Sequence, residues 1–268
     1  MTIKASRLSF LALVLAGISG SWIGCAEPAP STPPPSPDSS VVAADTTHII
    51  SPDTLSLPPV PTDTLGDLEQ SLIDAGLANI EEVDSTLLVE LRYSTTNNFL
   101  GFDMYGPLNH CYLQPDVADK LALANSYLAE KGLGYRLLVY DGVRPRSIQQ
   151  MMWDALDSLP VKERTNYVSN PNSGSQHNFG AAVDLTIADS TGQALDMGTP
   201  YDYFGELAYP KLQWELLEQG KLTRKQVDNR SLLRGVMYQA GFFGIGTEWW
   251  HFNSCRRAKA REIYQIVE

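Results

Sequence analysis

The sequence predicts a single domain in which helices and strands are mixed, preceded by a long N-terminal segment of different character. The 268 residues are enough for one sizeable hydrophobic core, and 43% of them are hydrophobic while 19% are charged, which is ordinary for a globular protein. Apolar stretches with the period of a strand alternate with stretches that have the period of a helix. Before residue 65, Pro, Ser and Thr dominate instead, so we expect the domain to occupy residues 65–268.

The extreme N-terminus has the layout of a secretory signal. Two basic residues precede an apolar run over 8–23, and this run is shorter than the about 20 residues that a membrane-spanning helix needs. The run ends just before Cys25 and resembles a bacterial lipoprotein signal, although Trp22 stands where that pattern usually has Leu. We expect residues 1–24 to be a signal peptide and Cys25 to carry a lipid that anchors the protein to a membrane of the bacterial cell envelope. The alternative is an ordinary cleaved signal that leaves the protein periplasmic.

Residues 25–64 form a segment rich in Pro, Ser and Thr, with scattered small apolar residues. Such a composition cannot bury enough apolar surface to offset the entropy lost when the chain is ordered. We therefore expect a flexible, disordered spacer between the lipid anchor and the domain.

Charge and cysteine content narrow the remaining options. A formal net charge of −11 and a sequence pI of about 4.8 argue against the basic face that nucleic acid requires, so no nucleic-acid partner is expected. If Cys25 is lipidated, Cys111 and Cys255 remain. These two can form a disulfide in an oxidising compartment or stay as two buried thiols, and sequence does not decide between the two.

Within the domain, the hydrophobic pattern predicts strands and helices in alternation. Strands are expected over 86–92, 135–140, 181–187 and 248–252. Helices are expected over 115–132, 147–156, 230–240 and 256–267. Pro115 stands in the opening turn of the first helix and Gly132 closes it, as the geometry of helix ends favours. The last helix is expected to pack on the back of the sheet.

The most informative stretch runs from Ser175 to Asp184 and reads Ser-Gln-His-Asn-Phe-Gly-Ala-Ala-Val-Asp. Its second half is apolar enough to be a buried strand, with His177 at its mouth and Asp184 well inside. An ionised carboxylate in an apolar strand is costly unless a cation meets it. Imidazole nitrogen and carboxylate oxygen together suit zinc, and His251 supplies a third ligand near the C-terminus.

No single residue of this set is decisive. A lone buried histidine is more often a hydrogen-bonded core residue than a ligand, and Arg144 is by position alone a surface arginine in a salt bridge. The combination changes this interpretation, because three protein ligands leave one tetrahedral zinc position for water. Glu248, three residues before His251, is a carboxylate that can act as the general base for that water. His48 in the spacer and His110 beside a cysteine form no rival set of matching quality.

Five separated motifs carry a family resemblance. They are Asn97-Asn98-Phe99, Asp141-Gly142-x-Arg144-Pro145, Ser175-x-His177-x-x-Gly180-x-Ala182-x-Asp184, Met197-Gly198 followed by Asp202, and Glu248-Trp249-Trp250-His251. In this order they resemble the D-alanyl-D-alanine dipeptidase family, zinc peptidases that act on D-alanine-containing peptidoglycan peptides. The likeness covers residues 87–252. It implies an α+β fold, in which one compact zinc-peptidase domain has a mainly antiparallel sheet flanked by helices.

The resemblance also implies a role for each matching residue. The ligands of one Zn²⁺ would be His177, Asp184 and His251. Glu248 would be the general base, and Arg144, whose guanidinium is always charged, would stabilise the developing oxyanion. Asp202 would hold the free ammonium group of the substrate, with a solvated or capping aspartate as the alternative. Ser175 would hydrogen-bond the substrate.

The implied function is zinc-dependent hydrolysis of D-alanyl-D-alanine or similar D,D-dipeptides. The nearest alternative is a D,D-carboxypeptidase that trims peptidoglycan stem peptides, which needs an open groove where a dipeptidase needs a carboxylate. A third interpretation is a zinc-stabilised, non-catalytic binding module of the envelope. Glu248 argues against this module because binding alone needs no base. An enzyme in the envelope would salvage dipeptides from wall turnover, so no resistance role is inferred.

Overall fold

The computed structural model describes residues 66–106 and 108–268. The predicted signal peptide, the lipidation site Cys25 and the predicted spacer lie outside these residues, so the predictions about them stay predictions. The helix α1 (Gly66–Asp74) begins the described part. Within it, no helix combines the length and the apolar character that crossing a membrane requires.

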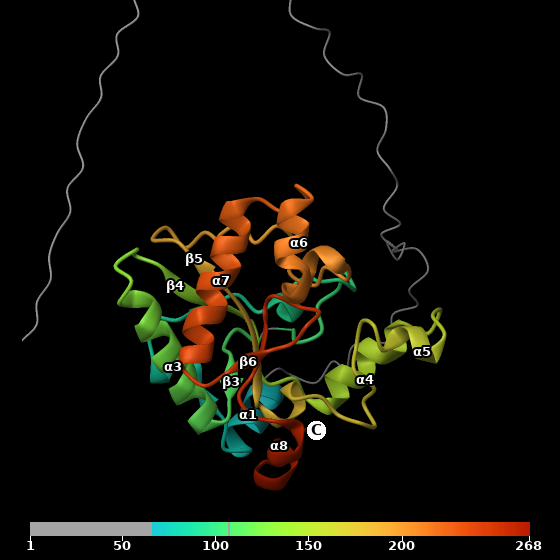
Figure 1. Ribbon diagram of the computed structural model, residues 1–268. Helices are drawn as coiled ribbons and strands as arrows, with labels where there is room; N and C mark the ends of the chain where they lie inside the picture. Colours follow the sequence, from blue (N-terminus) through green and yellow to red (C-terminus); the bar gives the residue numbers. More distant parts are fainter. Residues whose placement is uncertain (1–65, 107) are drawn as a thin grey trace, which may run out of the picture. The chain divides into compact units, whose positions relative to one another are not determined.

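A five-stranded sheet forms the framework of the domain (Figure 1). Its strands are, in spatial order, β2 (Leu88–Val89), β4 (Arg136–Asp141), β5 (Ala182–Ala188), β7 (His251–Asn253) and β6 (Phe243–Gly244). The strands β2 and β4 run parallel, whereas the other three neighbouring pairs are antiparallel. A separate antiparallel pair joins β1 (Ala78–Asn79) to β3 (Tyr112–Leu113). The central sheet is therefore mainly antiparallel, as predicted.

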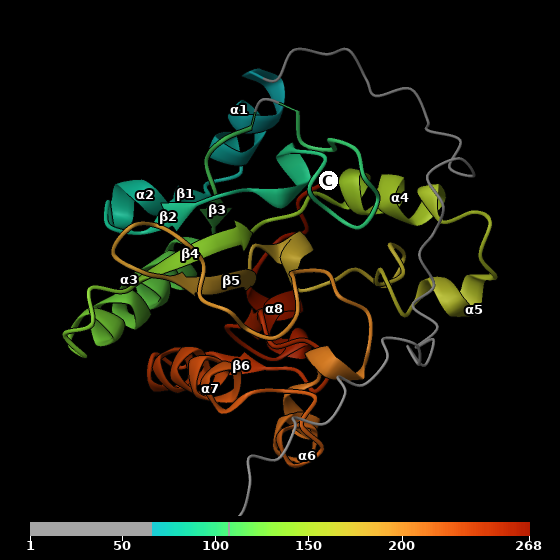
Figure 2. The ribbon, with the colours of Figure 1, turned by 90° about the horizontal axis from the view of Figure 1, so that it is seen from above.

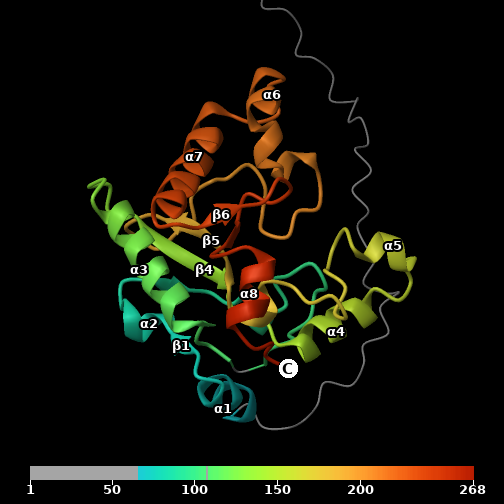
Figure 3. The same ribbon diagram turned by 60° about the horizontal axis from the view of Figure 1, so that its bottom comes forward.

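Seven further α-helices follow in the described part of the chain. They are α2 (Ile80–Val83), α3 (Pro115–Ala129), α4 (Arg146–Ala155), α5 (Val161–Arg164), α6 (Gln213–Glu218), α7 (Arg224–Gln239) and α8 (Arg257–Ile263). Figures 2 and 3 show α3 and α7 side by side, where α3 contacts β4 and α7 contacts β5. The predicted α+β fold, with helices outside a mainly antiparallel sheet, is confirmed.

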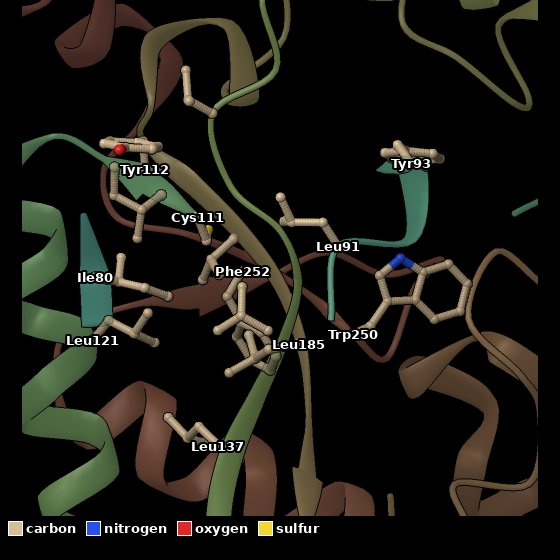
Figure 4. Packing of buried hydrophobic residues seen from close by; sticks show 14 of the residues in the cluster. Ile80, Leu91, Tyr93, Cys111, Tyr112, Leu121, Leu137, Leu185, Trp250 and Phe252 are labelled. Atoms are coloured by element: carbon tan, nitrogen blue, oxygen red, sulfur yellow. The ribbon is translucent and has the colours of Figure 1, made fainter. Parts of the chain in front are cut away.

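The hydrophobic core joins the sheet to these helices. Figure 4 shows Leu121 of α3, Leu137 of β4, Leu185 of β5 and Phe252 of β7 in one cluster, and none of them is more than 2% exposed. Burial of one such side chain contributes about 1.5–3 kcal/mol. All seven residues of β5 are buried, which explains why the strand is apolar almost throughout. The charged residue within it, Asp184, therefore needs a separate explanation.

Helix α7 begins at Arg224, earlier than the predicted start at Arg230. Its first turns are polar, so the apolar period that indicated the helix begins later than the helix itself. A capping box fixes the true start: the Thr223 hydroxyl accepts from the backbone N–H of Gln226, and the Gln226 side chain accepts from the backbone N–H of Thr223. The spacing Thr-x-x-Gln is visible in the sequence and could have placed this end.

Two predicted strands are shorter in the structure. Only Leu88–Val89 of the stretch 86–92 pairs as a strand, and the chain then enters a 3₁₀ turn at Arg92–Ser94 that buries Tyr93. The last strand begins at His251, so Glu248 lies in the loop before it. As a result of both changes, Tyr93 and Glu248 lie outside the strands, and both line the same cavity.

The two remaining cysteines are unpaired. Cys111 is buried and Cys255 is half-buried, and each is a free thiol. Of the two alternatives left open by the sequence, the disulfide is therefore not the one observed.

Gly142 offers a test of the packing at the end of β4. A Cβ atom at this position would lie 2.8 Å from the carbonyl oxygen of Tyr112 and would also collide with the Cys111 sulfur. We expect Gly142→Ala to lower the free energy of unfolding by about 1–3 kcal/mol through overpacking. A Cβ atom at Gly235, inside α7, would meet nothing within 4 Å, so Gly235→Ala should instead raise this free energy by up to about 1 kcal/mol. Urea unfolding measures the free energy of unfolding of both variants. Equal changes in the two would contradict a crowded position at Gly142 and an open one at Gly235.

Candidate active site

Three separate elements bring His177, Asp184 and His251 together. His177 lies in a 3₁₀ turn that ends at Gly180, a residue in the left-handed region with φ of 63°. Asp184 lies on β5 and His251 opens β7, and the two residues are direct partners in the antiparallel register of these strands. Paired residues of neighbouring strands project from the same face of a sheet. The register therefore places one imidazole beside the carboxylate, and the turn adds the second.

The ligand atoms of the three side chains converge. The Asp184 Oδ1 atom lies 2.9 Å from His251 Nδ1 and 3.4 Å from His177 Nε2, and the two imidazole nitrogens are 3.1 Å apart. Tetrahedral zinc with bonds of 2.0–2.1 Å requires ligand atoms separated by about 3.3 Å. The separations in this protein are close to that value, so the predicted ligand set is assembled with the spacing that zinc needs.

The far side of each imidazole is also held. His177 Nδ1 lies 2.7 Å from the carbonyl oxygen of Gly142, and His251 Nε2 lies 3.1 Å from Oδ1 of Asn253. Each of these nitrogens must donate, which directs the other nitrogen of each ring toward Asp184. This hydrogen bonding on the far side of a ligand fixes its tautomer and orientation.

The electrostatics of the cluster call for a cation at its centre. Burial alone would raise the pKa of Asp184, but the two histidines hold it well below its usual range. Burial likewise lowers the pKa of His251, yet its hydrogen bond to Asp184 raises it to about 9. In the protein alone, a proton on His251 thus supplies the positive charge, and zinc would take the place of that proton. The donor set fits zinc.

Glu248 lies beside this cluster and is not one of its three converging ligands. Its Oε2 atom is 3.9 Å from His251 Nδ1, and its side chain is about 30% exposed. Burial raises the pKa of Glu248, followed in importance by the nearby His251, which lowers it. A carboxylate at this distance can reach a water molecule held by the cluster.

Arg144 is buried, so the alternative of a surface arginine in a rim salt bridge is wrong. Its Nε and Nη2 atoms donate to Oδ2 of Asp141 at 3.0 and 2.6 Å, and its guanidinium lies 4.9 Å above the ring of Tyr93. Nη2 is 3.8 Å from Oδ2 of Asp184. The Tyr105 hydroxyl also donates to Asp141 at 2.7 Å. Asp141 therefore orients Arg144 toward the cluster, a role that the motif contained but that sequence reasoning did not assign.

Asp202 has an unusual backbone and an unsatisfied oxygen. Its φ of 58° makes it the only non-glycine residue with positive φ in the part of the chain that the structure describes. The Tyr93 hydroxyl donates to Oδ1 at 3.2 Å, whereas Oδ2 is buried without a hydrogen-bond partner. Burial, and then the negative charge of Asp184, raise the pKa of Asp202 well above its usual range. A cation placed against Oδ2 would offset both effects.

Ser175 lines the same site, but its hydroxyl already donates a hydrogen bond within the protein. Its hydroxyl donates to Oε1 of Gln149 at 2.8 Å, and this oxygen also accepts from the Asn178 side chain at 2.9 Å. The prediction that Ser175 hydrogen-bonds the substrate stays a prediction, and the geometry limits the hydroxyl to accepting such a bond.

A second tyrosine supports the cluster from outside the predicted set. The Tyr201 hydroxyl donates to Oδ2 of Asp184 at 2.9 Å and lies 3.2 Å from the hydroxyl of Tyr93. Beside this cluster lies a cavity of about 250 Å³, whose lining includes Tyr93, Asp184, Glu248 and Asp202. The sequence does not predict this role of Tyr201, because a hydroxyl contact between residues 17 apart leaves no pattern.

Comparisons with known proteins were made with the sequence and the fold. A family model described as D-ala-D-ala dipeptidase matches residues 73–267. The D-alanyl-D-alanine dipeptidase of Escherichia coli (strain K12) is 32% identical over 176 residues, which are 66% of this chain and 83% of that protein. The D-alanyl-D-alanine dipeptidase of Enterococcus faecium is 27% identical over 194 residues, or 67% of this chain and 92% of that protein.

Two solved structures are similar to this chain at lower sequence identity. The LdcB LD-carboxypeptidase has a TM-score of 0.36 at 19% identity and covers 57% of this chain and 63% of its own. The vancomycin resistance D,D-pentapeptidase VanY of the VanB-type cassette, solved with Zn(II), has a TM-score of 0.33 at 17% identity, over 58% of this chain and 80% of its own.

A carboxylate held beside a set of metal ligands, yet outside it, distinguishes a metal-dependent hydrolase from a structural metal site. This protein has that arrangement, and it is a zinc metallopeptidase. Over residues 73–267 the match shows that the chain belongs to the D-alanyl-D-alanine dipeptidase family, as the resemblance of its motifs indicated.

Metal content tests the assignment of ligands. We expect His177→Ala and His251→Ala each to lose bound zinc, because two remaining ligands do not make a stable site. Glu248→Ala should keep one zinc per chain, since Glu248 is not among the converging ligands. Elemental analysis of the purified proteins measures this directly. Full zinc content in both histidine variants, or its loss from Glu248→Ala, would contradict the assignment.

Proposed function

We propose that this protein hydrolyses D-alanyl-D-alanine and similar D,D-dipeptides in a zinc-dependent reaction, as the names of its relatives indicate for those proteins. The observation that carries the proposal is the unpartnered Oδ2 atom of Asp202, a residue that lines the same cavity as Glu248 and the ligand cluster. A base beside a metal site indicates hydrolysis, and a carboxylate without a partner indicates a cationic substrate group. The cavity of about 250 Å³ is smaller than the about 300–1,000 Å³ typical of sites for drug-sized ligands, which suits a two-residue substrate.

Glu248 performs the proton transfers of the proposed reaction. Zinc bound by the three ligands supplies a Lewis acid that activates water and polarises a carbonyl group. Glu248 accepts a proton from the water molecule while the oxygen of that water attacks the scissile carbonyl carbon. It then donates this proton to the nitrogen of the departing D-alanine, so one carboxylate serves both halves of the reaction. Its raised pKa suits a group that must both take and release a proton.

Arg144 stabilises the negative charge that develops on the carbonyl oxygen. Its guanidinium is fixed by two hydrogen bonds to the buried Asp141 and lies within 3.8 Å of a carboxylate oxygen of Asp184. A donor oriented before the reaction begins needs no reorganisation when the charge appears. Asp141 keeps the charged form of Arg144 stable in a buried position, because an unpaired buried guanidinium would be costly.

Asp202 separates the dipeptidase from the carboxypeptidase alternative. The free ammonium group of a dipeptide can occupy the position beside Oδ2, whereas a longer stem peptide carries an uncharged amide there. A buried carboxylate without a partner favours the ammonium group, because neither charge is otherwise satisfied. The alternative of a non-catalytic binding module has no comparable support, because binding alone does not need the general base that Glu248 supplies.

The proposed location is the bacterial cell envelope, with the chain held at a membrane through lipid on Cys25. The support is the sequence around Cys25, which lies outside the described residues. In that location the enzyme would act on dipeptides released during turnover of the wall.

Acetylation of the substrate tests the proposed function. The zinc-loaded protein should cleave free D-alanyl-D-alanine, and Glu248→Ala should lower kcat by about 10²–10⁴ through loss of the base. N-acetylation removes the positive charge that Asp202 is proposed to bind. Stranding one buried charge costs about 3–5 kcal/mol, so kcat/KM for the acetylated dipeptide should be lower by about 10²–10⁴.

Asp202→Asn serves as the matched variant for this experiment. It preserves the shape of the side chain but removes its charge, so the difference between free and acetylated substrates should shrink. Equal cleavage of both substrates, or of a stem peptide, by the unmodified enzyme would show that the dipeptidase proposal is wrong.

Fractionation tests the proposed anchor. Cys25→Ser should move the protein from the membrane fraction to the soluble fraction of the envelope, because the serine cannot carry the thioether-linked lipid. Mass analysis of the mature N-terminus of the unmodified protein should show the lipid. An unchanged distribution of the variant would rule out anchoring through Cys25.

A further inference from the structure

The proposed substrate is a zwitterion, and the residue that meets its negative end has not been assigned. Arg257 lines the same cavity as Asp202 and Glu248. It stands at the start of α8, six residues after the ligand His251. We propose that Arg257 binds the C-terminal carboxylate of the D,D-dipeptide. This inference rests on the proposed function and adds a specificity-determining residue to it.

The contacts of Arg257 orient its guanidinium without neutralising it. Its Nη2 atom donates to the main-chain carbonyl oxygens of Ser173 and Gly174. These acceptors are uncharged, and Arg257 forms no ion pair with any residue in 66–106 or 108–268. Burial, together with the neighbouring Arg261, lowers the pKa of the guanidinium, which an anionic partner would raise. The side chain is therefore fixed at the cavity with its positive charge unmatched.

Two other polar side chains at the cavity, Arg144 and Ser175, already have partners within the protein. Arg144 directs two hydrogen bonds to Asp141, whose negative charge balances its own. Ser175 donates its proton to Gln149. Among the arginine and lysine side chains that line the cavity in the described part of the chain, Arg257 is thus the one whose charge is left for a ligand.

Arg257 and Asp202 reach the cavity from different segments of the chain. The carbonyl groups that hold it immediately precede Ser175, at the beginning of the segment that carries His177. Asp202 belongs to another segment, where it contacts Tyr93. Arg257 and Asp202 form no ion pair with each other, so within the described residues the Arg257 guanidinium and the Oδ2 atom of Asp202 are both left without a charged partner. A ligand with an ammonium and a carboxylate group offers one partner to each of these two residues.

The size of the expected effect follows from the exposure of the residue. A hydrogen bond to a charged group changes affinity by about ten- to a hundredfold. Arg257 is exposed at the edge of the cavity, and solvent weakens such a pair. We therefore expect loss of its charge to lower kcat/KM for the free-acid dipeptide by about tenfold, mainly through KM.

The experiment compares D-alanyl-D-alanine with its C-terminal amide, D-alanyl-D-alaninamide, on the zinc-loaded enzyme. The amide keeps the ammonium group and the scissile bond but lacks the carboxylate charge. Arg257→Gln should lower kcat/KM for the acid by about tenfold and leave the amide nearly unaffected. Arg261→Gln is the matched control: Arg261 donates to the same Ser173 carbonyl at 2.9 Å but does not line the cavity. This control should keep the acid-to-amide ratio of the unmodified enzyme.

The ratio of the two substrates decides the outcome. Because both are measured on one preparation, the folded fraction of each variant cancels. An unchanged ratio in Arg257→Gln would overturn the role of Arg257, whether both substrates slow equally or neither does, while the proposed hydrolysis would stand. An unmodified enzyme that cleaves neither substrate would overturn the proposed function and the inference together.

Discussion

The cost of burying the charge of Asp184 governs the arrangement of this protein. The residue is 3% exposed on a strand whose seven members are all buried, where an ionised carboxylate without partners would be strongly disfavoured. Its two oxygens instead meet two imidazoles, the Tyr201 hydroxyl and, at 3.8 Å, the Arg144 guanidinium. The elements that supply these groups are separated in sequence and must fold together around the strand. Packing and chemistry are thus linked at one carboxylate.

The charges around this carboxylate fall into two kinds. Asp141 and Arg144 balance each other in a buried pair, and removing one partner of such a pair costs about 3–5 kcal/mol because the other is left unmatched. Asp202 and Arg257 are different, since both line the cavity, Oδ2 of Asp202 has no hydrogen-bond partner, and Arg257 forms no ion pair within the described residues. The first pair fixes the position of Arg144, and the second two residues are the ones proposed to bind the substrate. The same side-chain types therefore serve structure or binding according to whether a partner is present.

The ligand set was predictable because its signals are local. An aspartate within an apolar strand and a histidine at the mouth of that strand are visible in one stretch, and Glu248 and His251 lie three residues apart. The supporting groups were not predictable from pattern. Tyr105 and Asp141 are 36 residues apart, and the bond between them depends on loop conformations that no period describes. The same holds for Asn253, whose contact with His251 involves side-chain orientation and not strand register.

Secondary structure shows a similar division. The long strand β5 and the helix α3 were evident from apolar periodicity, whereas the polar first turns of α7 were missed despite their Thr223–Gln226 capping box. The strand expected over 86–92 proved short because the chain bends into a 3₁₀ turn that buries Tyr93 against the site. Periodicity describes which face of an element is apolar, but it does not describe where a functional side chain forces the element to end.

The register of β5 with β7 makes the metal a cross-link as well as a cofactor. Asp184 and His251 face each other across the ladder although 67 residues separate them in the chain. An ion that joins them closes a long loop, and closing a loop of this length removes much of the conformational freedom of the unfolded chain. The cysteines at 111 and 255 provide no covalent closure, since both are free thiols. Zinc bound at this position would therefore tie the C-terminal strand to the centre of the sheet, so that the supply of metal sets the stability of the fold.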